Sequence, residues 1–392
     1  MEHGLARFVP VLLAPGLLAS AAAAAEESAE DRKFDVSASI SPNGKWLVLF
    51  VSEMETGSSE VDPDVTFLRE TGKKLFRVAL SAKKPKVSLL HESREPDARA
   101  YVYGNTRYFA NALVLDDGTA IAMTAGTNLA RWNAAGKFSE QKVFKEYSFR
   151  QLSLVTGGRK LIANRRIWGA KRTITNEIVD LKTHQIVAAP FLNGLLGEPM
   201  QWTSDMKHVY GIDVLTTTVP FTSKDGTVIS STQETRRLVR ASTQGQEKMV
   251  VASDLPYTPI CFGKNVIAYS GRNKDGVDTF HRIKKGDPPV VEVIPGLKSW
   301  TPVLALEEDR FLLRSGTERH GIVTFSAAGD EAARTPQVDL LALPPHEHIL
   351  YSAPLKAFVL SKDGVAFKLV DLKGTELWQI QLAPATGKSA GK

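Results

Sequence analysis

Cysteine is nearly absent from this sequence. The 392 residues include a single cysteine, Cys261, so no disulfide can form within the chain. A protein without disulfides is stabilised by its hydrophobic core, and 43% apolar residues at this length are enough to build a large one. Cys261 lies in the apolar run 259–262, which predicts a buried thiol; an intermolecular disulfide is the alternative.

Long hydrophobic runs are lacking after residue 25. Before it, Arg7 precedes an apolar stretch, and residues 21–25 are alanines followed by the polar Glu26. This pattern predicts a signal peptide, residues 1–25, and a periplasmic or secreted protein. The alternative is an uncleaved anchor, because residues 8–25 just reach the shortest membrane span. No later run does so, and we expect no membrane span after cleavage.

A concentrated basic stripe is missing too, although the net charge is +6 and the pI is near 9.2. Nucleic-acid binding calls for clustered Lys and Arg residues, so we expect no nucleic-acid partner. Several basic residues, Arg240 and Arg282 among them, fall on predicted outer hairpins. There the sequence predicts that their charge discourages aggregation between sheet edges.

Long amphipathic helices are absent, and one short unit recurs instead. In this unit a polar turn leads into a strongly apolar strand, and Asn-Gly or Asp-Gly turns of this kind indicate tight hairpins. The turns lie at residues 41–45, 115–119, 156–160, 204–207, 263–265, 307–310 and 353–356.

A second hairpin follows each of these units, which gives four strands per unit and seven units. In the first unit we place it at residues 67–76, with a turn at Thr71-Gly72, and expect loops at 52–64 and 91–107. The pattern predicts an all-β fold, a single seven-bladed β-propeller over residues 26–382, with a disordered tail at 383–392.

The turn that begins the first unit carries a family resemblance. Residues 41–48, Ser-Pro-Asn-Gly-Lys-Trp-Leu-Val, resemble the repeat of WD40-like TolB-type β-propellers, and residues 267–276 resemble its next stretch. Met206 and Arg310 stand where that repeat has glycine. The resemblance implies a propeller that binds a partner or ligand. The family includes translocation-system propellers, peptidase-associated propellers and propeller lyases.

A basic loop in the third unit is one candidate contact site. It contains an aromatic residue among its cations, and we expect it to project from the face where propellers bind partners; a solvated hairpin loop is the alternative. Its candidate residues are Arg165, Arg166, Trp168 and Arg172.

Aromatic residues near the start of several first strands form a second candidate. Trp202, Tyr257 and Trp300 would line the central channel and grip a peptide or sugar, or they would fill the space between blades.

A histidine pair is the candidate metal site. His346 and His348 would lie on one side of an extended segment, where zinc or manganese needs a third ligand from another blade. Surface or inter-blade histidines are the alternative, and we predict no cofactor. Residues 387–391, Gly-Lys-Ser-Ala-Gly, match the G-x-S-x-G motif of serine hydrolases. They lie in the expected tail, so no catalytic residue is assigned.

These observations predict an exported, monomeric binding or scaffolding module of the cell envelope, without catalytic activity. Its expected ligand is an envelope protein, a peptide or a saccharide. The alternative is a propeller enzyme, a lyase or glycosidase acting on an anionic saccharide. Such an enzyme needs an acid/base pair or a metal at the channel mouth, so convergence of carboxylates with His346 and His348 distinguishes the two hypotheses.

Overall fold

The structure is a computed structural model. It describes residues 33–58, 66–81, 83–93, 112–124, 127–146, 150–155, 158–167, 173–203, 205–222, 228–245, 247–273, 275–317, 319–325, 336–362 and 366–382. The expected signal peptide and C-terminal tail lie outside these residues. The described chain forms seven antiparallel sheets of four strands each, which confirms the predicted seven-bladed β-propeller.

Each blade consists of four strands that are consecutive in the sequence. Blades one to four are β1 Lys33–Ile40, β2 Trp46–Ser58, β3 Thr66–Ala79 and β4 Lys86–Ser93; β5 Ala112–Val114, β6 Ala120–Thr124, β7 Asn128–Trp132 and β8 Phe138–Lys142; β9 Arg150–Leu154, β10 Lys160–Ile167, β11 Thr173–Asp180 and β12 Ile186–Ala188; and β13 Leu195–Trp202, β14 His208–Thr222, β15 Val228–Ser242 and β16 Lys248–Ala252.

The remaining three blades follow in the same order. They are β17 Ile260–Phe262, β18 Val266–Arg272, β19 Asp278–Lys284 and β20 Val290–Val293; β21 Thr301–Ala305, β22 Arg310–Ser315, β23 Arg319–Thr324 and β24 Val338–Leu341; and β25 His348–Ser352, β26 Ala357–Ser361, β27 Ala366–Asp371 and β28 Glu376–Gln381. Two short 3-10 helices, η1 Pro190–Leu192 and η2 Pro295–Leu297, lead out of blades three and five. Among the described residues, no helix has the length and hydrophobicity needed to cross a membrane.

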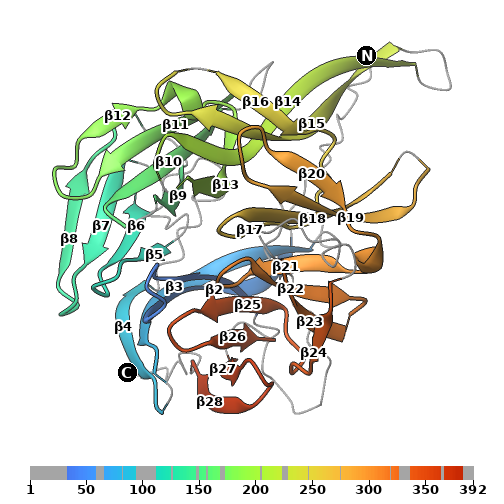
Figure 1. The fold of residues 1–392 in the computed structure, drawn as a ribbon. Helices are drawn as coiled ribbons and strands as arrows, with labels where there is room; N and C mark the ends of the chain where they lie inside the picture. The colour runs from blue at the N-terminus through green and yellow to red at the C-terminus, as the bar shows by residue number, and fades with distance from the viewer. Residues whose placement is uncertain are drawn as a thin grey trace, which may run out of the picture.

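The blades follow one another around a ring, and the first blade lies beside the last (Figure 1). First strands contact first strands around this ring, from β1 to β5, β9, β13, β17 and β21, and from β25 back to β1. The first strand of each blade therefore faces the central axis. Because every blade is built from consecutive strands, the two ends of the chain do not share a blade.

The hydrophobic core is divided into seven clusters, and each lies between two neighbouring blades. Each blade thus buries both of its faces. This explains why the second strands are continuous apolar runs rather than alternating ones. In β2, Leu47, Val48 and Leu49 are all at most 1% exposed, with Val48 facing blade two and the other two facing blade seven.

Blades seven and one close the ring through side chains. Their shared cluster includes Trp378 of β28, whose Nε1 donates to the carbonyl of Ser81 at 2.6 Å. Ser352 Oγ donates to the carbonyl of Gly44 at 2.7 Å. Packing and these two hydrogen bonds replace a strand shared between the termini.

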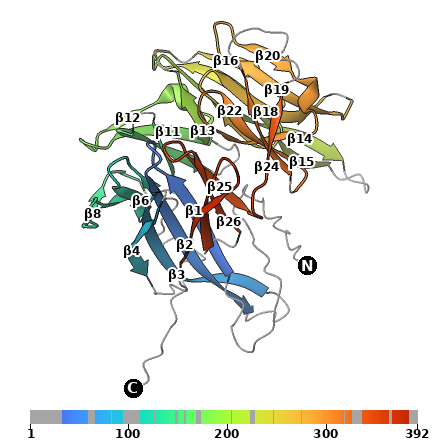
Figure 2. The same cartoon turned by 60° about the horizontal axis from the view of Figure 1, so that its bottom comes forward.

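The first blade differs from the prediction. The expected turn at Thr71-Gly72 is wrong, because β3 runs through it, and the register shifts so that Glu53 faces Gly72 and Met54 faces Glu70. Thr71 is therefore the extra residue of a β-bulge. β2 likewise extends to Ser58, where a loop from Ser52 was expected. The β2–β3 and β14–β15 hairpins are longer than the others and project from the ring (Figure 2).

An arginine recurs at one position of the third strand in four blades. In each of these blades, a backbone hydrogen bond to a carbonyl closes the turn between the first and second strands; in blade one this is the carbonyl of Trp46. The arginine pairs with the residue that lies two places after that carbonyl on the second strand. The pairs are Arg77 with Val48, Arg131 with Ile121, Arg240 with Tyr210, and Arg282 with Ala268.

Three of these arginines bind the outer turn of the next blade. Arg77 donates to the carbonyls of Asn133 and Ala134, Arg131 to that of Leu181, and Arg240 to that of Gly286. Arg282 lies over the ring of Phe325 instead, at 5.4 Å. The side chains of Arg240 and Arg282 are 10% and 3% exposed. The prediction that these two residues protect sheet edges is therefore wrong, and they join blades together.

Candidate functional site

One cavity lies on the axis of the ring. Its volume is about 550 Å³, and it is lined by residues of the first strand of all seven blades and of the turns that follow. These are Ser39, Ile40, Ser41, Pro42 and Gly44 of blade one, Leu113, Ser153, Leu154, Pro199, Met200, Trp202, Ile260, Cys261, Phe262, Val303, Leu304, Ala305, Tyr351 and Ala353, with Ile162 of a second strand.

The lining of this axial cavity is mostly apolar. It includes Leu113, Leu154, Met200, Phe262 and Leu304, and its hydroxyls come from serines and one tyrosine. Within the part of the chain that the structure describes, no carboxylate, imidazole, lysine or arginine lines it. Burial also raises the pKa of the Cys261 thiol to about 12, so this side chain is a neutral thiol at ordinary pH.

Two polar groups of residues that border the axial cavity have no hydrogen-bond partner among the described residues. They are the indole Nε1 of Trp202, whose ring meets Phe191 edge-on at 5.9 Å, and the hydroxyl of Tyr351. Burial, together with the charge of Glu307, raises the pKa of the Tyr351 hydroxyl. Both groups are therefore neutral donors, buried at the wall of an apolar cavity.

The three predicted channel aromatics lie in three different environments. Trp202, the last residue of β13, borders the axial cavity and also packs against the core between blades three and four. Trp300 is 7% exposed in the core between blades five and six, with Arg319 over its ring at 5.4 Å, which is the alternative of inter-blade packing. Tyr257 is 71% exposed beneath Arg236 and does not line the cavity. These three residues therefore do not line the central channel together.

The predicted basic loop begins at the end of β10. Arg165 and Arg166 belong to this strand, and Arg165 Nη1 lies 2.7 Å from Glu146 Oε2. That carboxylate is 69% exposed, so the ion pair adds little to stability. Trp168 and Arg172 lie outside the described residues. Because β10 starts beside the turn that leads out of β9, Arg165 and Arg166 lie at the end of this strand away from the axial cavity.

The predicted metal pair is not assembled into a site in the described chain. Nδ1 of His346 donates to the Pro344 carbonyl at 2.8 Å, and its ring packs against that of His320 at 4.9 Å. His348 begins β25, whereas Tyr351 and Ala353 at the other end of this strand border the axial cavity. No group of three or more His, Cys, Asp or Glu residues that could hold a metal occurs among the residues described. The acid/base or metal constellation of the enzyme hypothesis is not found there.

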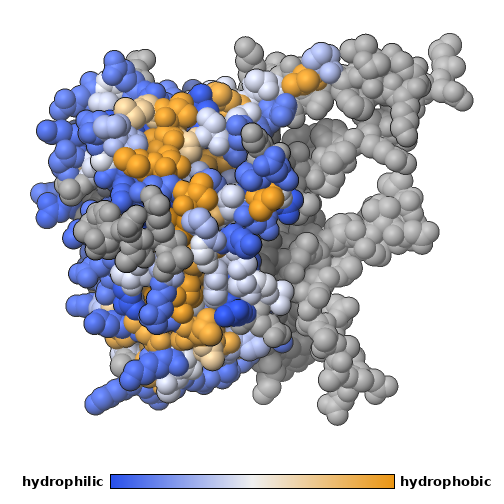
Figure 3. All heavy atoms as spheres, turned by 45° about the vertical axis from the view of Figure 1, so that its right-hand side comes forward, coloured by the Kyte–Doolittle hydropathy of each residue, from blue (hydrophilic) through white to orange (hydrophobic). Residues whose placement is uncertain are grey.

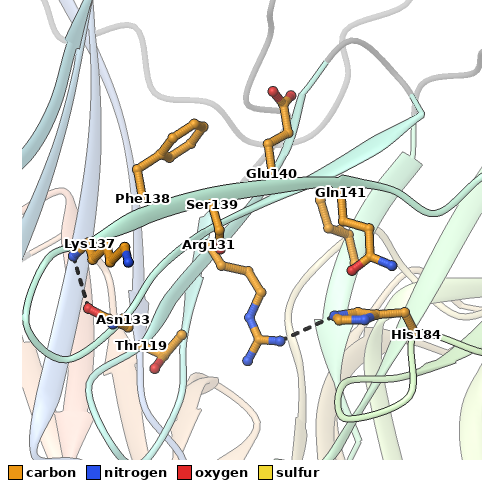
Figure 4. A pocket seen from close by; sticks show the side chains of 10 residues that line it. Thr119, Arg131, Asn133, Lys137, Phe138, Ser139, Glu140, Gln141 and His184 are labelled. Carbon is orange, nitrogen blue, oxygen red and sulfur yellow. Dashed lines mark hydrogen bonds between the residues drawn. The ribbon is translucent and has the colours of Figure 1, made fainter.

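A second cavity, of about 380 Å³, opens between blades two and three at the outer side of the ring (Figure 4). We call it the rim cavity. It is lined by Thr119, Leu129, Arg131, Asn133, Lys137, Phe138, Ser139, Glu140, Gln141 and His184. In contrast to the axial cavity, it contains cationic side chains.

Strand alternation decides which side chains of β7 and β8 share a face in the rim cavity. Arg131 pairs with Ser139 and Leu129 with Gln141, so these side chains lie on one face, whereas Glu140 pairs with Ala130 on the other. Figure 4 shows the Arg131 side chain pointing toward His184 while Glu140 points away from both. The Arg131 guanidinium donates to His184 Nε2 at 3.2 Å.

Sequence reasoning missed Arg131 and His184. The position shared by Arg77, Arg131 and Arg240 becomes visible only once the seven units are aligned on their turns. The other three blades carry Ile178, Ile322 and Leu369 there, which hides the repetition.

Apolar side chains also remain exposed on the outermost strands. Val187 of β12 is 59% exposed, Leu340 of β24 is 64% exposed, and Val290 and Val293 of β20 are 49% and 51% exposed. Figure 3 shows that hydrophobic side chains form separate groups among hydrophilic ones on the face in view.

Comparison with known proteins shows a likeness of fold. No family model and no curated protein sequence matches this chain. Among solved structures, one from a study of two prolyl endopeptidases is 11% identical over 89% of this chain and 50% of its own, with a TM-score of 0.50. This chain therefore spans about half of that protein.

Two further solved structures are similar at low identity. The β-propeller domain of the Trilobed protease from Pyrococcus furiosus, described as having an open velcro topology, is 9% identical over 91% of this chain and 99% of its own, with a TM-score of 0.48. TolB from Acinetobacter baumannii is 9% identical over 82% and 77%, with a TM-score of 0.41. At these identities each likeness concerns the fold alone.

Proposed function

We propose that this protein is an exported binding propeller whose axial cavity holds an apolar segment of an envelope protein. The observation that carries the proposal is the lining of this cavity, to which all seven first strands contribute apolar side chains. A concave, largely preformed and apolar site with a few convergent polar groups is the usual form of a ligand pocket.

The composition of the cavity favours a peptide segment over a saccharide. A sugar needs a dense set of hydrogen-bonding side chains, whereas Leu154, Met200, Phe262 and Leu304 offer hydrocarbon surface. A volume of about 550 Å³ accommodates one or two apolar side chains of a partner. Peptide carbonyl groups are suitable acceptors for the hydroxyl group of Tyr351 at the wall, which has no hydrogen-bond partner among the described residues.

Membership of the TolB-type propellers is part of the same proposal. It is supported by the Ser-Pro-Asn-Gly-Lys-Trp signature at residues 41–46 and by the shared fold. The alanine-rich segment at 21–25 supports export through a cleaved signal peptide. In this proposal the protein acts as a monomer, with one axial site per chain.

The proposal is tested by capture of partners with matched variants. The purified protein is used as bait for solubilised envelope proteins, beside the variants Leu304→Glu and Val187→Glu. Both introduce one carboxylate, but Leu304 borders the axial cavity and Val187 lies exposed on an outer strand. Thermal unfolding of each variant confirms that the fold is retained.

We expect a discrete partner that is retained by the parent protein and by Val187→Glu. Leu304→Glu should retain at least about tenfold less, because a carboxylate in an apolar contact is desolvated without a counter-ion. Equal retention by a folded Leu304→Glu variant would contradict the proposal.

A further inference from the structure

The rim cavity differs from the other inter-blade junctions in how its arginine is satisfied. Arg77 is 6% exposed and donates to three carbonyls, those of Gly118, Asn133 and Ala134. Arg131 occupies the same repeat position but is half-buried, and among the described residues it donates to one carbonyl, that of Leu181 at 3.0 Å, and to His184 Nε2. A guanidinium has five N–H donors, so Arg131 has donors to spare.

The spare donors arise from the turn of blade three. In this turn, Asp180 Oδ1 accepts the backbone N–H groups of Lys182 and Thr183, and His184 has a positive φ of 57°. The turn therefore presents an imidazole to Arg131 where blade two presents two carbonyls to Arg77. The space between the blades stays open as the cavity of about 380 Å³.

The two cations of this cavity are not engaged in ion pairs with described carboxylates. Within the described chain, neither Arg131 nor Lys137 is among the residues that form ion pairs. Glu140 lies on the opposite face of β8 from the guanidinium, and its carboxylate accepts from Asn128 Nδ2 at 3.1 Å. Two cations thus line a cavity that also offers the side-chain amide of Gln141, whereas the hydroxyl of Thr119 donates to Asp117 Oδ2 at 3.0 Å.

We propose that the rim cavity binds the carboxylate of a small organic acid. The planar fork of Arg131 matches a carboxylate, and Lys137 adds a second positive charge. His184 holds the guanidinium by accepting one of its N–H groups, which orients it toward the blade interface. The volume lies near the lower end for ligand pockets, which suits a molecule the size of a monosaccharide acid or of a single amino-acid residue.

This site is separate from the axial one and does not depend on the proposed function. The carboxylate could come from an acidic sugar or from the C-terminal residue of a peptide. Isothermal titration calorimetry of the purified full-length protein separates the two sources. The probes are glucuronate with glucose as its neutral counterpart, and N-acetylalanine with N-acetylalanine amide as its neutral counterpart.

We expect at least one of the two carboxylates to bind, with a dissociation constant of about 1 mM or lower for a ligand of this size. Each neutral counterpart should bind at least about tenfold more weakly. Binding of glucuronate alone identifies an acidic sugar as the ligand, and binding of N-acetylalanine alone identifies a peptide terminus. Absence of binding by both carboxylates, or equal binding of acid and neutral counterpart, overturns the proposal.

Two variants place the binding in this cavity. Arg131→Gln should weaken binding by about tenfold or more, and Lys137→Gln by severalfold. Lys298→Gln, at an exposed position of blade five, removes the same charge elsewhere and should change nothing. Lys137→Gln leaves the bonds of Arg131 between the blades intact, so it tests the proposal even if Arg131→Gln fails to fold. Unchanged affinity in a folded Lys137→Gln variant places the binding outside the cavity and overturns the assignment.

Discussion

The guanidinium of Arg77 in blade one donates to the carbonyl of Ala134 in blade two at 2.8 Å. The same guanidinium also donates to the carbonyls of Gly118 and Asn133. One side chain of a third strand thus holds both turns of the neighbouring blade. The equivalent arginines of blades two and four bind the outer turn of the next blade, so a polar connection supplements the apolar packing between blades.

Replacement of Arg77 should destabilise the protein strongly. Arg77→Met keeps the aliphatic part of the side chain but leaves three carbonyls without their donor, at a cost of about 2–4 kcal/mol in the free energy of unfolding. Urea-induced unfolding measures the change. Arg314→Met is the control, because Arg314 is exposed, and we expect it to change the free energy by less than about 0.5 kcal/mol. Equal urea midpoints for both variants would show that the hydrogen bonds of Arg77 do not contribute to stability.

The closure of the ring between blades seven and one leads to a prediction for Trp378, with Trp202 as its control. Trp378→Phe removes the hydrogen bond to the Ser81 carbonyl and should cost about 1 kcal/mol, with faster hydrogen exchange in blades one and seven. Trp202→Phe is the matched control, since its Nε1 is buried without a partner in the described chain and its removal should be neutral or stabilising. A larger loss for Trp202→Phe than for Trp378→Phe contradicts the assigned roles.

Lys285 gives a prediction for alkaline pH. Burial lowers its pKa from 10.5 to about 8, although Asp309 acts in the opposite direction. Between about pH 8 and 9.5 the unfolded chain keeps this proton while the folded protein has released it. The unfolded state thus binds more protons, and this group makes stability increase with pH over that window.

The comparison is made with Lys285→Met. The pH dependence of its unfolding free energy between pH 8 and 9.5 should differ from that of the parent protein by about one proton, in the direction of lost stabilisation with rising pH. Lys298→Met, which changes an exposed lysine, should leave the slope unaltered. Identical slopes for the parent and Lys285→Met show that Lys285 stays protonated in the folded state.

Cys261 should be protected from thiol reagents while the protein is folded. Its pKa is raised to about 12 by burial, so the reactive thiolate is scarce at pH 8. Labelling with iodoacetamide should therefore be slow in buffer and complete in denaturing urea, as followed by mass spectrometry. Rapid labelling of the folded protein contradicts the burial of this thiol at the axial wall.

Much of the fold could be predicted because the turn chemistry is local. All seven predicted apolar strands are second strands, from β2 after residues 41–45 to β26 after residues 353–356. Their continuous apolar character reflects burial on both faces of a blade. The prediction failed at Gly72, because a glycine at a β-bulge and a glycine in a tight turn look the same in one sequence.

The sites were harder to predict, because they depend on contacts between blades. Trp202 ends the first strand of blade four and borders the axial cavity, whereas Trp300 precedes the first strand of blade six and packs in the core between two blades. The difference depends on where the neighbouring blade places its side chains. Arg131 resembled any surface cation until the turn of blade three was placed against it.

The most direct test of the axial binding site is photo-crosslinking in living cells. A photoreactive phenylalanine analogue replaces Met200, which borders the axial cavity, or Val187, which lies exposed on an outer strand. We predict a discrete crosslinked envelope protein from position 200 and none from position 187. No crosslink at position 200, or the same product from both positions, would contradict a binding site on the propeller axis.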